Sequence, residues 1–377
     1  MINPSHEPTP VAIELPPAIE VNSMARTSRR AFLELSGKLA VAAMATDLGL
    51  VSQAAEPAGG PSLLHRYSDY GWLRGFSVVP SWGARIEEAW WNYHPDRMRE
   101  EVTLARQVHA NCIRLWIEFT AWMADPERVT AHFCDAVRAI SQAGMKTMPC
   151  LFNRWHDDQY DYGGTYLENL ARIEMHTPYV QALVKPLAAD EAVLIWDLCN
   201  EPQAYDLGSA ANQKEFAWLK AIAATVRACG ARQPITIGTM AGSNIETYAP
   251  LCDVLCAHPY LPNRQGLEGL IAGYSALRQK HGKPMLVNEC IPGCLDDGLR
   301  GKCAAYYTEL LSGAGLGWMG WALREGKAIS TRRDRYDNNG VNGEGFHPFF
   351  TKEGRLRPHL EFLREKPRLQ APWEKES

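Results

Sequence analysis

The most informative segment of this chain is Val193-Leu194-Ile195-Trp196-Asp197-Leu198-Cys199-Asn200-Glu201-Pro202. It begins as a run of apolar, strand-forming residues, which is typical of a strand buried on both faces in a parallel sheet. Proline has no N–H to donate to a neighbouring strand, so the strand must end at Pro202. Glu201 therefore stands at the carboxyl end of the strand, next to an amide side chain, Asn200, that can orient a polar group.

A second strand ends in the same way. Met285-Leu286-Val287-Asn288-Glu289 is another short apolar run that closes on a glutamate. One such ending could be a solvated turn. Two of them favour a shared site, because in a closed parallel barrel the carboxyl ends of all strands meet at one face.

The rest of the chain alternates strand and helix around these two runs. Besides the opening stretch, we expect strands at 72–78, 112–116, 146–152, 234–238, 254–260, 285–289 and 317–323. We expect helices at 95–110, 126–143, 178–189, 209–229, 267–281, 302–313 and 356–365. Eight strands with helices between them predict an α/β fold, a single (β/α)8 TIM barrel. The long connections 153–175 and 332–345 predict extended loops after strands 3 and 8.

The N-terminal segment does not belong to the barrel in this interpretation. Arg29-Arg30, followed by Phe32-Leu33 and a mild apolar stretch, is typical of a twin-arginine (Tat) export signal. An amphipathic helix of the domain is the alternative. The apolar stretch is too short and interrupted for a stable membrane span. We therefore expect the Tat export machinery as a partner and a periplasmic or extracellular location.

This interpretation divides the chain into four parts. Residues 1–54 form the N-terminal extension and twin-arginine signal segment, and residues 55–65 form a linker. Residues 66–366 form the barrel, and residues 367–377 form a solvated C-terminal tail.

Composition excludes several functions. An apolar fraction of 46% in 377 residues supports a large core. A net charge of −4 argues against nucleic-acid binding, which needs a basic face. The ten cysteines form no Cys-x-x-Cys pair with a matching histidine cluster, so we expect neither a metal nor another cofactor. One or two disulfides remain open at this point.

Further polar and aromatic residues fall at or near the expected strand ends. They are Arg114 in strand 2, His258 and Tyr260 at strand 6, and Trp321 in strand 8. With Glu201 and Glu289 they would surround one mouth of the barrel. Each also has a structural alternative: Arg114 as a buried ion-pair partner, His258 as a core or rim histidine, and Trp321 as plain core.

With these residues in place, the sequence resembles clan A glycoside hydrolases, and most closely glycoside hydrolase family 5. The resemblance covers about residues 66–366. It rests on Asn200-Glu201-Pro202, the strand 7 glutamate Glu289, the pair His258-x-Tyr260 and Trp321. A carbohydrate substrate is the partner that it implies.

The resemblance also implies roles. Glu201 would be the acid/base and Glu289 the nucleophile, while Asn200 would bind the hydroxyl beside the reacting carbon. Arg114 would keep Glu289 ionised, and Tyr260 would hydrogen-bond it. The other substrate-binding candidates are His258, Trp321 as the floor of a subsite, and Asn153 or His156 after strand 3.

The chemistry explains why two carboxyl groups are needed. A glycosidic bond breaks through an oxocarbenium-like state, so one carboxyl group donates a proton while the other stabilises positive charge. For retention of configuration the two groups stand roughly 5–5.5 Å apart. The pKa of Glu201 should be raised by the opposing charge, and Arg114 should lower the pKa of Glu289.

The sequence thus predicts a retaining O-glycosyl hydrolase that cleaves β-linked oligo- or polysaccharides through a glycosyl-enzyme intermediate. A catalytically silent carbohydrate-binding barrel and a transglycosylase that uses the same carboxylates remain alternatives. A metal-dependent barrel hydrolase is disfavoured because no His-x-His lies on an early strand. We interpret Glu118, Asp296 and Asp297 as solvated loop residues or contacts to substrate hydroxyls.

Overall fold

The computed structural model describes residues 63–153, 173–241, 244–328, 330–337 and 339–374. The chain divides into two units, Met1–Gly60 and Pro61–Ser377, and the described residues all belong to the second. The signal segment, His156 and most of the loop after strand 3 lie outside the described residues.

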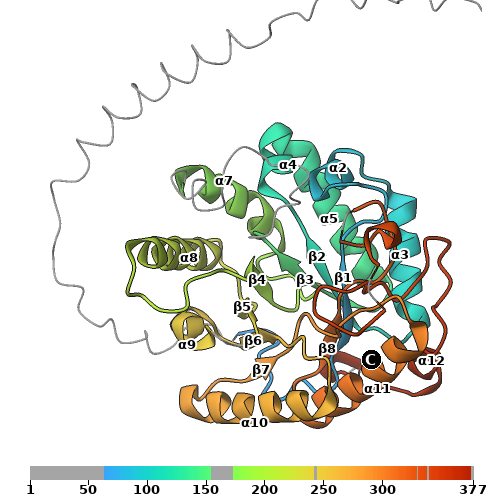
Figure 1. Cartoon of the computed structure of the whole chain (residues 1–377). Coiled ribbons are helices and arrows are strands. Elements are labelled where there is room, and N and C mark those ends of the chain that lie inside the picture. Colours follow the sequence, from blue (N-terminus) through green and yellow to red (C-terminus); the bar gives the residue numbers. More distant parts are fainter. Residues whose placement is uncertain (1–62, 154–172, 242–243, 329, 338, 375–377) are drawn as a thin grey trace, which may run out of the picture. The chain divides into compact units, whose positions relative to one another are not determined.

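The second unit is a (β/α)8 barrel (Figure 1). Its strands are β1 (Arg74–Val78), β2 (Cys112–Trp116), β3 (Lys146–Cys150), β4 (Trp196–Asn200), β5 (Ile235–Met240), β6 (Leu255–His258), β7 (Met285–Leu286) and β8 (Trp318–Gly320). Neighbouring strands pair in parallel in the order β7-β6-β5-β4-β3-β2-β1-β8. A parallel bridge between Cys290 and Gly320 joins the two ends of this sheet and closes the barrel.

Helices surround the strands, as Figure 1 shows. They are α2 (Ile86–Trp91), α3 (Pro95–Gln107), α4 (Phe119–Ala124), α5 (Pro126–Gln142), α7 (Ile173–Val184), α8 (Ala210–Ala228), α9 (Ile245–Tyr248), α10 (Arg264–His281), α11 (Asp297–Gly313) and α12 (Phe362–Glu365). Among the described residues, no helix has both the length and the apolar character needed to cross a membrane.

Helix α5 shows how local sequence sets these elements. The Asp125 side chain accepts a hydrogen bond from the Arg128 N–H and caps the helix, and Pro126 occupies the first turn, where its missing N–H costs nothing. The buried face carries Val129, Phe133, Val137 and Ile140, as the spacing predicted.

Helix α11 begins earlier than predicted. We expected its start at residue 302, but the Asp296 side chain caps the helix by accepting from the Leu299 N–H, and Asp297 begins it. Gly298 and Gly301 lower the helix propensity of the first turns, which hid this start in the sequence. Asp297 also pairs with Arg300. Asp296 is exposed, as we predicted for a solvated residue, whereas Asp297 is partly buried beside Arg300.

The barrel interior is filled by side chains from opposite strands. Cys112, Met148, Cys256, Leu286 and Met319 form one buried cluster, although they come from β2, β3, β6, β7 and β8. Side chains from strands on opposite sides can meet only inside the barrel. A larger apolar cluster packs the helices against the sheet.

The C-terminal tail is solvated only in part, whereas we predicted a solvated end. Trp373 packs edge-on against Trp72, with ring centroids 5.0 Å apart, and Ala371 is fully buried. The Lys146 ammonium lies 5.3 Å from the centre of the Trp373 ring. Since Trp72 and Lys146 stand at the amino ends of β1 and β3, the tail covers the face of the barrel opposite the strand carboxyl ends. The sequence hid this because 367–374 shows no long helical or strand period.

Candidate active site

Three polar side chains, those of Asp197, Asn200 and Glu201, lie together at the end of β4, more than a regular strand would bring to one side. The pairing of β4 with β5 shifts register between Asp197 and Asn200, as in a β-bulge. This irregularity lets both side chains reach the same partner, Arg114. Glu201 follows with φ +49°, a left-handed conformation that is uncommon for a residue with a side chain. Its N–H donates to the Gly238 carbonyl (2.9 Å).

Arg114 is fully buried and connects the two glutamate-bearing strands. Its Nε donates to Asp197 Oδ2 (2.9 Å), one terminal nitrogen to Glu289 Oε2 (2.6 Å), and the other to Asn200 Oδ1 (2.7 Å). Burial alone would lower the pKa of Arg114, but Asp197 and Glu289 raise it above its usual value. Arg114 is therefore both a buried ion-pair partner and part of the site, so the two interpretations of this residue are not exclusive.

Glu289 is held from two sides. In addition to Arg114, the Tyr260 hydroxyl donates to Glu289 Oε1 (2.9 Å). Burial nevertheless raises the pKa of Glu289, while His258, Arg114 and the Tyr260 hydrogen bond act in the opposite direction. Arg114 thus lowers the pKa of Glu289, as we expected, but the net shift is upward, because the loss of hydration and the neighbouring Glu201 charge outweigh the favourable contacts.

His258 joins the two glutamates. Its Nδ1 lies 2.8 Å from Glu201 Oε1 and 3.9 Å from Glu289 Oε2, and its Nε2 lies 2.7 Å from Asn288 Oδ1. Burial disfavours a charged imidazole, but the Glu289 and Glu201 carboxylates and the Cys256 thiol raise the pKa of His258 well above its usual value. The structure places this histidine in the site rather than in the apolar core.

The two carboxyl groups are close enough to act on one atom. One oxygen of Glu201, one oxygen of Glu289 and a nitrogen of His258 all lie within 4.8 Å of one another. Both glutamates are about nine-tenths buried, with exposed fractions of 8% and 7%. A cation could in principle bind such a group, but these atoms already have hydrogen-bond partners, and the positive charge of Arg114 touches Glu289. We therefore assign no metal or cofactor to the site.

Two tryptophans lie side by side at the mouth. Trp321 follows β8 and is half-buried, and its ring centroid is 5.1 Å from that of Trp116 at the end of β2. The Trp321–Ala322 peptide bond is cis. The Arg114 guanidinium carbon lies 4.8 Å from the centre of the Trp116 ring. A partly exposed indole beside the carboxylates offers a flat apolar surface on which a sugar ring can stack.

Asn153 also reaches the site, whereas His156 lies outside the described residues. Asn153 is bridged to Asn200 through the backbone, and its Oδ1 accepts a hydrogen bond from Asn200 Nδ2 (3.3 Å). The orientation of the Asn200 amide is thus fixed by Arg114 on one side and Asn153 on the other.

Glu118 is buried rather than solvated, which corrects our interpretation. It caps α4 by accepting a hydrogen bond from the Phe119 N–H (3.2 Å), and it is 9% exposed. Burial, and then the neighbouring Glu87, raise the pKa of Glu118 to about 8. No local signal predicts this burial, because Glu118 lies just after β2, where an exposed loop is expected.

Sequence reasoning missed two residues of the network, Asp197 and Asn288. Both are fully buried, and Asn288 Nδ2 donates to Asp197 Oδ2 (3.0 Å). Each stands one to four positions before a predicted catalytic glutamate, inside an apolar run. A polar residue within such a run is the signal that could have identified them, because a buried polar group needs a partner.

The chain after Glu201 is fixed by three side chains. The Asn244 amide donates to the Pro202 carbonyl (2.8 Å). The Ala204 N–H donates to Glu215 Oε1 (2.8 Å) and lies 2.9 Å from the Tyr248 hydroxyl, which itself donates to Glu215. These contacts hold the backbone that carries Glu201 in its unusual conformation.

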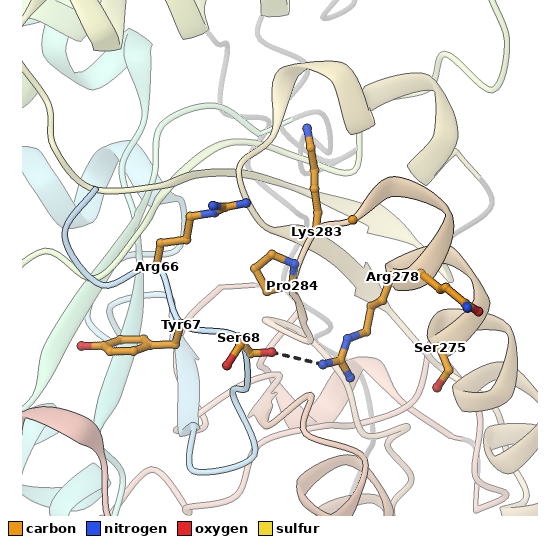
Figure 2. A pocket seen from close by; sticks show the side chains of 9 residues that line it. Arg66, Tyr67, Ser68, Ser275, Arg278, Lys283 and Pro284 are labelled. Atoms are coloured by element: carbon orange, nitrogen blue, oxygen red, sulfur yellow. Dashed lines mark hydrogen bonds between the residues drawn. The ribbon is translucent and has the colours of Figure 1, made fainter. Parts of the chain in front are cut away.

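A separate hollow of about 630 Å³ lies far from the carboxylates, at the amino ends of β1 and β7 (Figure 2). Arg66, Arg278 and Lys283 contribute its positive charge. As Figure 2 shows, Arg278 donates to the Ser68 carbonyl (3.2 Å). Lys283 donates to the backbone carbonyls of Ala249 and Cys252. Two of these cations thus tie loops together, and we do not place the reaction here.

Comparison with known proteins agrees with this geometry. The family model for cellulase, glycosyl hydrolase family 5, matches residues 73–327. A search of curated protein sequences found no match.

Solved structures share the fold at low sequence identity. The exo-β-1,4-mannosidase Op5Man5 from Opitutaceae bacterium strain TAV5 is 16% identical, with a TM-score of 0.60 over 80% of this chain and 60% of that one, less than two thirds of its length. GH5_18 from Streptomyces cattleya, in complex with GlcNAc, is 12% identical, with a TM-score of 0.58 over 79% and 82% of the two chains. The endo-1,4-β-D-mannanase from Thermotoga petrophila RKU-1 is 15% identical, with a TM-score of 0.58 over 78% and 98%.

The match to the family model spans more than half of the chain and includes the strands that carry both glutamates. The chain therefore belongs to glycosyl hydrolase family 5 and is an O-glycosyl hydrolase built on a (β/α)8 barrel.

Proposed function

We propose that this protein is a retaining hydrolase of β-linked glycosides that works by double displacement. The observation that carries the proposal is the close approach of the two carboxyl groups, with an oxygen of Glu201 and an oxygen of Glu289 within 4.8 Å. Inverting enzymes need roughly 6.5–9.5 Å to admit a water between the groups, whereas direct attack needs about 5–5.5 Å.

In the first step, Glu289 attacks the anomeric carbon while Glu201 gives its proton to the departing glycosidic oxygen. The C–O bond to the leaving group breaks, and an ester bond forms between the sugar and Glu289. Arg114 and Tyr260 hold the Glu289 carboxylate in one orientation (2.6 and 2.9 Å), so little reorganisation is needed for attack. Asn200, fixed by Arg114 and Asn153, is placed to bind the hydroxyl beside the reacting carbon.

In the second step, Glu201, now ionised, takes a proton from water as the water oxygen attacks the anomeric carbon. The ester bond to Glu289 breaks, and the free sugar leaves with its original configuration. If a sugar hydroxyl replaces water, the same step is transglycosylation. A silent carbohydrate-binding barrel is the weaker alternative, because it would not need Glu201 and Glu289 to keep such a closely bonded, buried arrangement.

For the substrate, we propose a β-linked hexoside, with β-mannosides as the first to test. We choose β-mannosides first because two of the matching structures are named as an exo-β-1,4-mannosidase and an endo-1,4-β-D-mannanase. β-Glucosides and β-galactosides belong in the same panel, since the described residues fix the reacting centre and not the outer subsites.

The test is release of sugar from chromogenic β-glycosides, soluble β-glucans and β-mannans, with E201Q and E289Q as controls. We expect activity in the wild type alone, and the first product seen by proton NMR should be the β-anomer. An α-anomer as first product would overturn the retaining mechanism. Silence across the panel, with sugars still raising the melting temperature, would favour the binding barrel.

Azide separates the two roles. In Glu289→Ala, azide should replace the missing nucleophile and give an α-glycosyl azide. In Glu201→Ala it should attack the glycosyl-enzyme and give a β-glycosyl azide. If the two variants gave each other's product, the assignment of acid/base and nucleophile would be reversed.

We also propose export through the Tat pathway to the periplasm or the cell exterior. The support is Arg29-Arg30 in the sequence, together with the ten cysteines, which are all free thiols and mostly buried. A chain without disulfides can fold in the reducing cytoplasm before it is transported. Replacing both arginines by lysine in the full chain should retain the protein in the cytoplasm, and unchanged export of that variant would refute the proposal.

A further inference from the structure

Asn288 directly precedes the proposed nucleophile, Glu289, in the sequence. In space it contacts His258, which faces the proposed acid/base, Glu201. Asn288 is fully buried. Its Oδ1 lies 2.7 Å from His258 Nε2 and 2.9 Å from the Cys256 thiol, and its Nδ2 donates to Asp197 Oδ2 (3.0 Å). Thus one amide side chain touches both the histidine that faces Glu201 and the aspartate that binds Arg114.

The orientation of this amide follows from its partners. The Asp197 carboxylate can only accept hydrogen bonds, so the NH₂ group of Asn288 must face it. Asn288 Oδ1 then faces His258, and because a carbonyl oxygen cannot donate, His258 Nε2 must carry a hydrogen. Arg114 fixes Asp197 from the other side through a 2.9 Å hydrogen bond, so the carboxylate cannot turn away.

The titrating nitrogen of His258 is therefore Nδ1, which points at Glu201 (2.8 Å). One proton lies between Nδ1 and the Glu201 carboxyl group. The charged and titratable groups around the ring are Glu201, Glu289 at 3.9 Å and the Cys256 thiol, while Asp197 acts through Asn288.

We propose that Asn288, oriented by Asp197, is a positioning residue that keeps a hydrogen on His258 Nε2, so that Nδ1 is the nitrogen that shares a proton with Glu201. The single proton held between Nδ1 and Glu201 is then the one that Glu201 passes to the leaving group. This inference rests on the acid/base role proposed for Glu201.

Glu201 and His258 together hold the same number of protons before the first step and after the second. Before reaction, Glu201 and His258 together hold one proton beyond the Nε2 hydrogen. Glu201 passes it to the leaving oxygen as the glycosidic bond breaks, and His258 Nδ1 then has no proton to share. When water attacks the glycosyl-enzyme, its proton returns to the pair through Glu201. No other acid, base or redox partner is required.

Removing the amide should change the pH profile. In Asn288→Ala, neutral His258 is free to carry its hydrogen on Nδ1 and to donate to the Glu201 carboxylate. A hydrogen bond to the charged form lowers the pKa of a carboxyl group, so the basic limb of kcat/KM should move to lower pH by about one unit. At neutral pH, the variant should lose about tenfold in kcat/KM on substrates with poor leaving groups, and much less on activated aryl glycosides.

The matched control is Asn111→Ala. Asn111 is also a fully buried asparagine with two hydrogen bonds, to the Arg74 N–H (3.1 Å) and the Trp72 carbonyl (2.8 Å), but it stands at the amino end of β2. Asn111→Ala should lower the unfolding free energy by a similar amount and leave the basic limb of kcat/KM unmoved. An equal loss on both substrate classes in Asn288→Ala, with the limb unmoved, would show a merely structural role.

A spectroscopic measurement decides the matter without turnover. In the full chain with ¹⁵N-labelled histidine, the His258 signals are assigned by their loss in His258→Ala. We expect the Nε2–H tautomer or the fully protonated ring in the wild type at every pH. A neutral ring with hydrogen on Nδ1 would overturn the proposal, even if Asn288→Ala does not fold. Because this result does not depend on activity, failure of the proposed function remains distinguishable from failure of this inference.

Discussion

Gly238 in β5 offers the sharpest test of the site geometry, because His258 packs directly against its α-carbon. A Cβ atom added at this position would lie 2.3 Å from His258 Nε2, 2.7 Å from Cε1 and 3.2 Å from Asn288 Oδ1. Ordinary contacts between such atoms are about 3.5 Å or more, so in Gly238→Ala the ring must retreat by roughly 1 Å.

That displacement has a calculable effect. If the ring moved straight away from the added Cβ, its 2.7 Å contact to Asn288 would lengthen to about 3.1 Å, close to the usual limit of a hydrogen bond at about 3.2 Å. Overpacking of a core costs about 1–3 kcal/mol of unfolding free energy. A misplacement of about 1 Å near the reacting atoms can cost on the order of 10²-fold in rate. We therefore expect Gly238→Ala to fold with reduced stability and to lose about two orders of magnitude in kcat/KM.

The assay measures kcat/KM on an aryl β-glycoside together with urea unfolding, in wild-type and His258→Ala backgrounds. If the clash acts through the imidazole, Gly238→Ala should add little to the loss already caused by His258→Ala. Such non-additivity is expected only for residues in direct contact. Near-wild-type activity of Gly238→Ala, or an equal fold-loss in both backgrounds, would refute the reasoning.

Three further predictions concern stability. The pKa of Glu118 is raised to about 8, so the folded chain keeps a proton that the unfolded chain loses above about pH 4.5, and stability should fall as the pH rises through this range. Glu118→Gln should therefore raise the unfolding free energy at pH 8, by up to about 4 kcal/mol, and change it little at pH 4. Tyr248→Phe removes the hydroxyl that donates to buried Glu215 and should lower the unfolding free energy by about 1–3 kcal/mol in the same urea assay. Gly273→Ala in α10, where an added Cβ meets nothing within 4 Å, should raise the thermal midpoint, with a gain of about 0.5–1 kcal/mol.

Much of the barrel could be predicted from local sequence. Strand β2 has the predicted bounds, and α5 has the predicted cap and buried face, because an apolar run and an Asp-Pro start are local signals. The short helices α2 and α4 were not predicted, since six residues provide less than two turns of periodicity. The packing of Trp373 in the C-terminal tail was also missed, because it depends on Trp72 and Lys146, which are distant in sequence.

The residues that stand at the carboxyl ends of the strands could be identified from the amino-acid pattern alone. Apolar runs that close on Glu201 and Glu289 place both carboxyl groups at one face of any parallel barrel, whatever the details of packing. Family membership and the main site residues follow from that pattern.

The hydrogen bonds among these groups, by contrast, depend on the folded barrel. Arg114 and Glu289 are 175 positions apart, and Asp197 and Asn288 are 91 apart, so their contacts of 2.6 and 3.0 Å depend on closure of the whole barrel. The sign of the Glu289 pKa shift and the tautomer of His258 follow from burial and from partners on other strands. Both are set by distances in space, for which a linear sequence carries no direct signal.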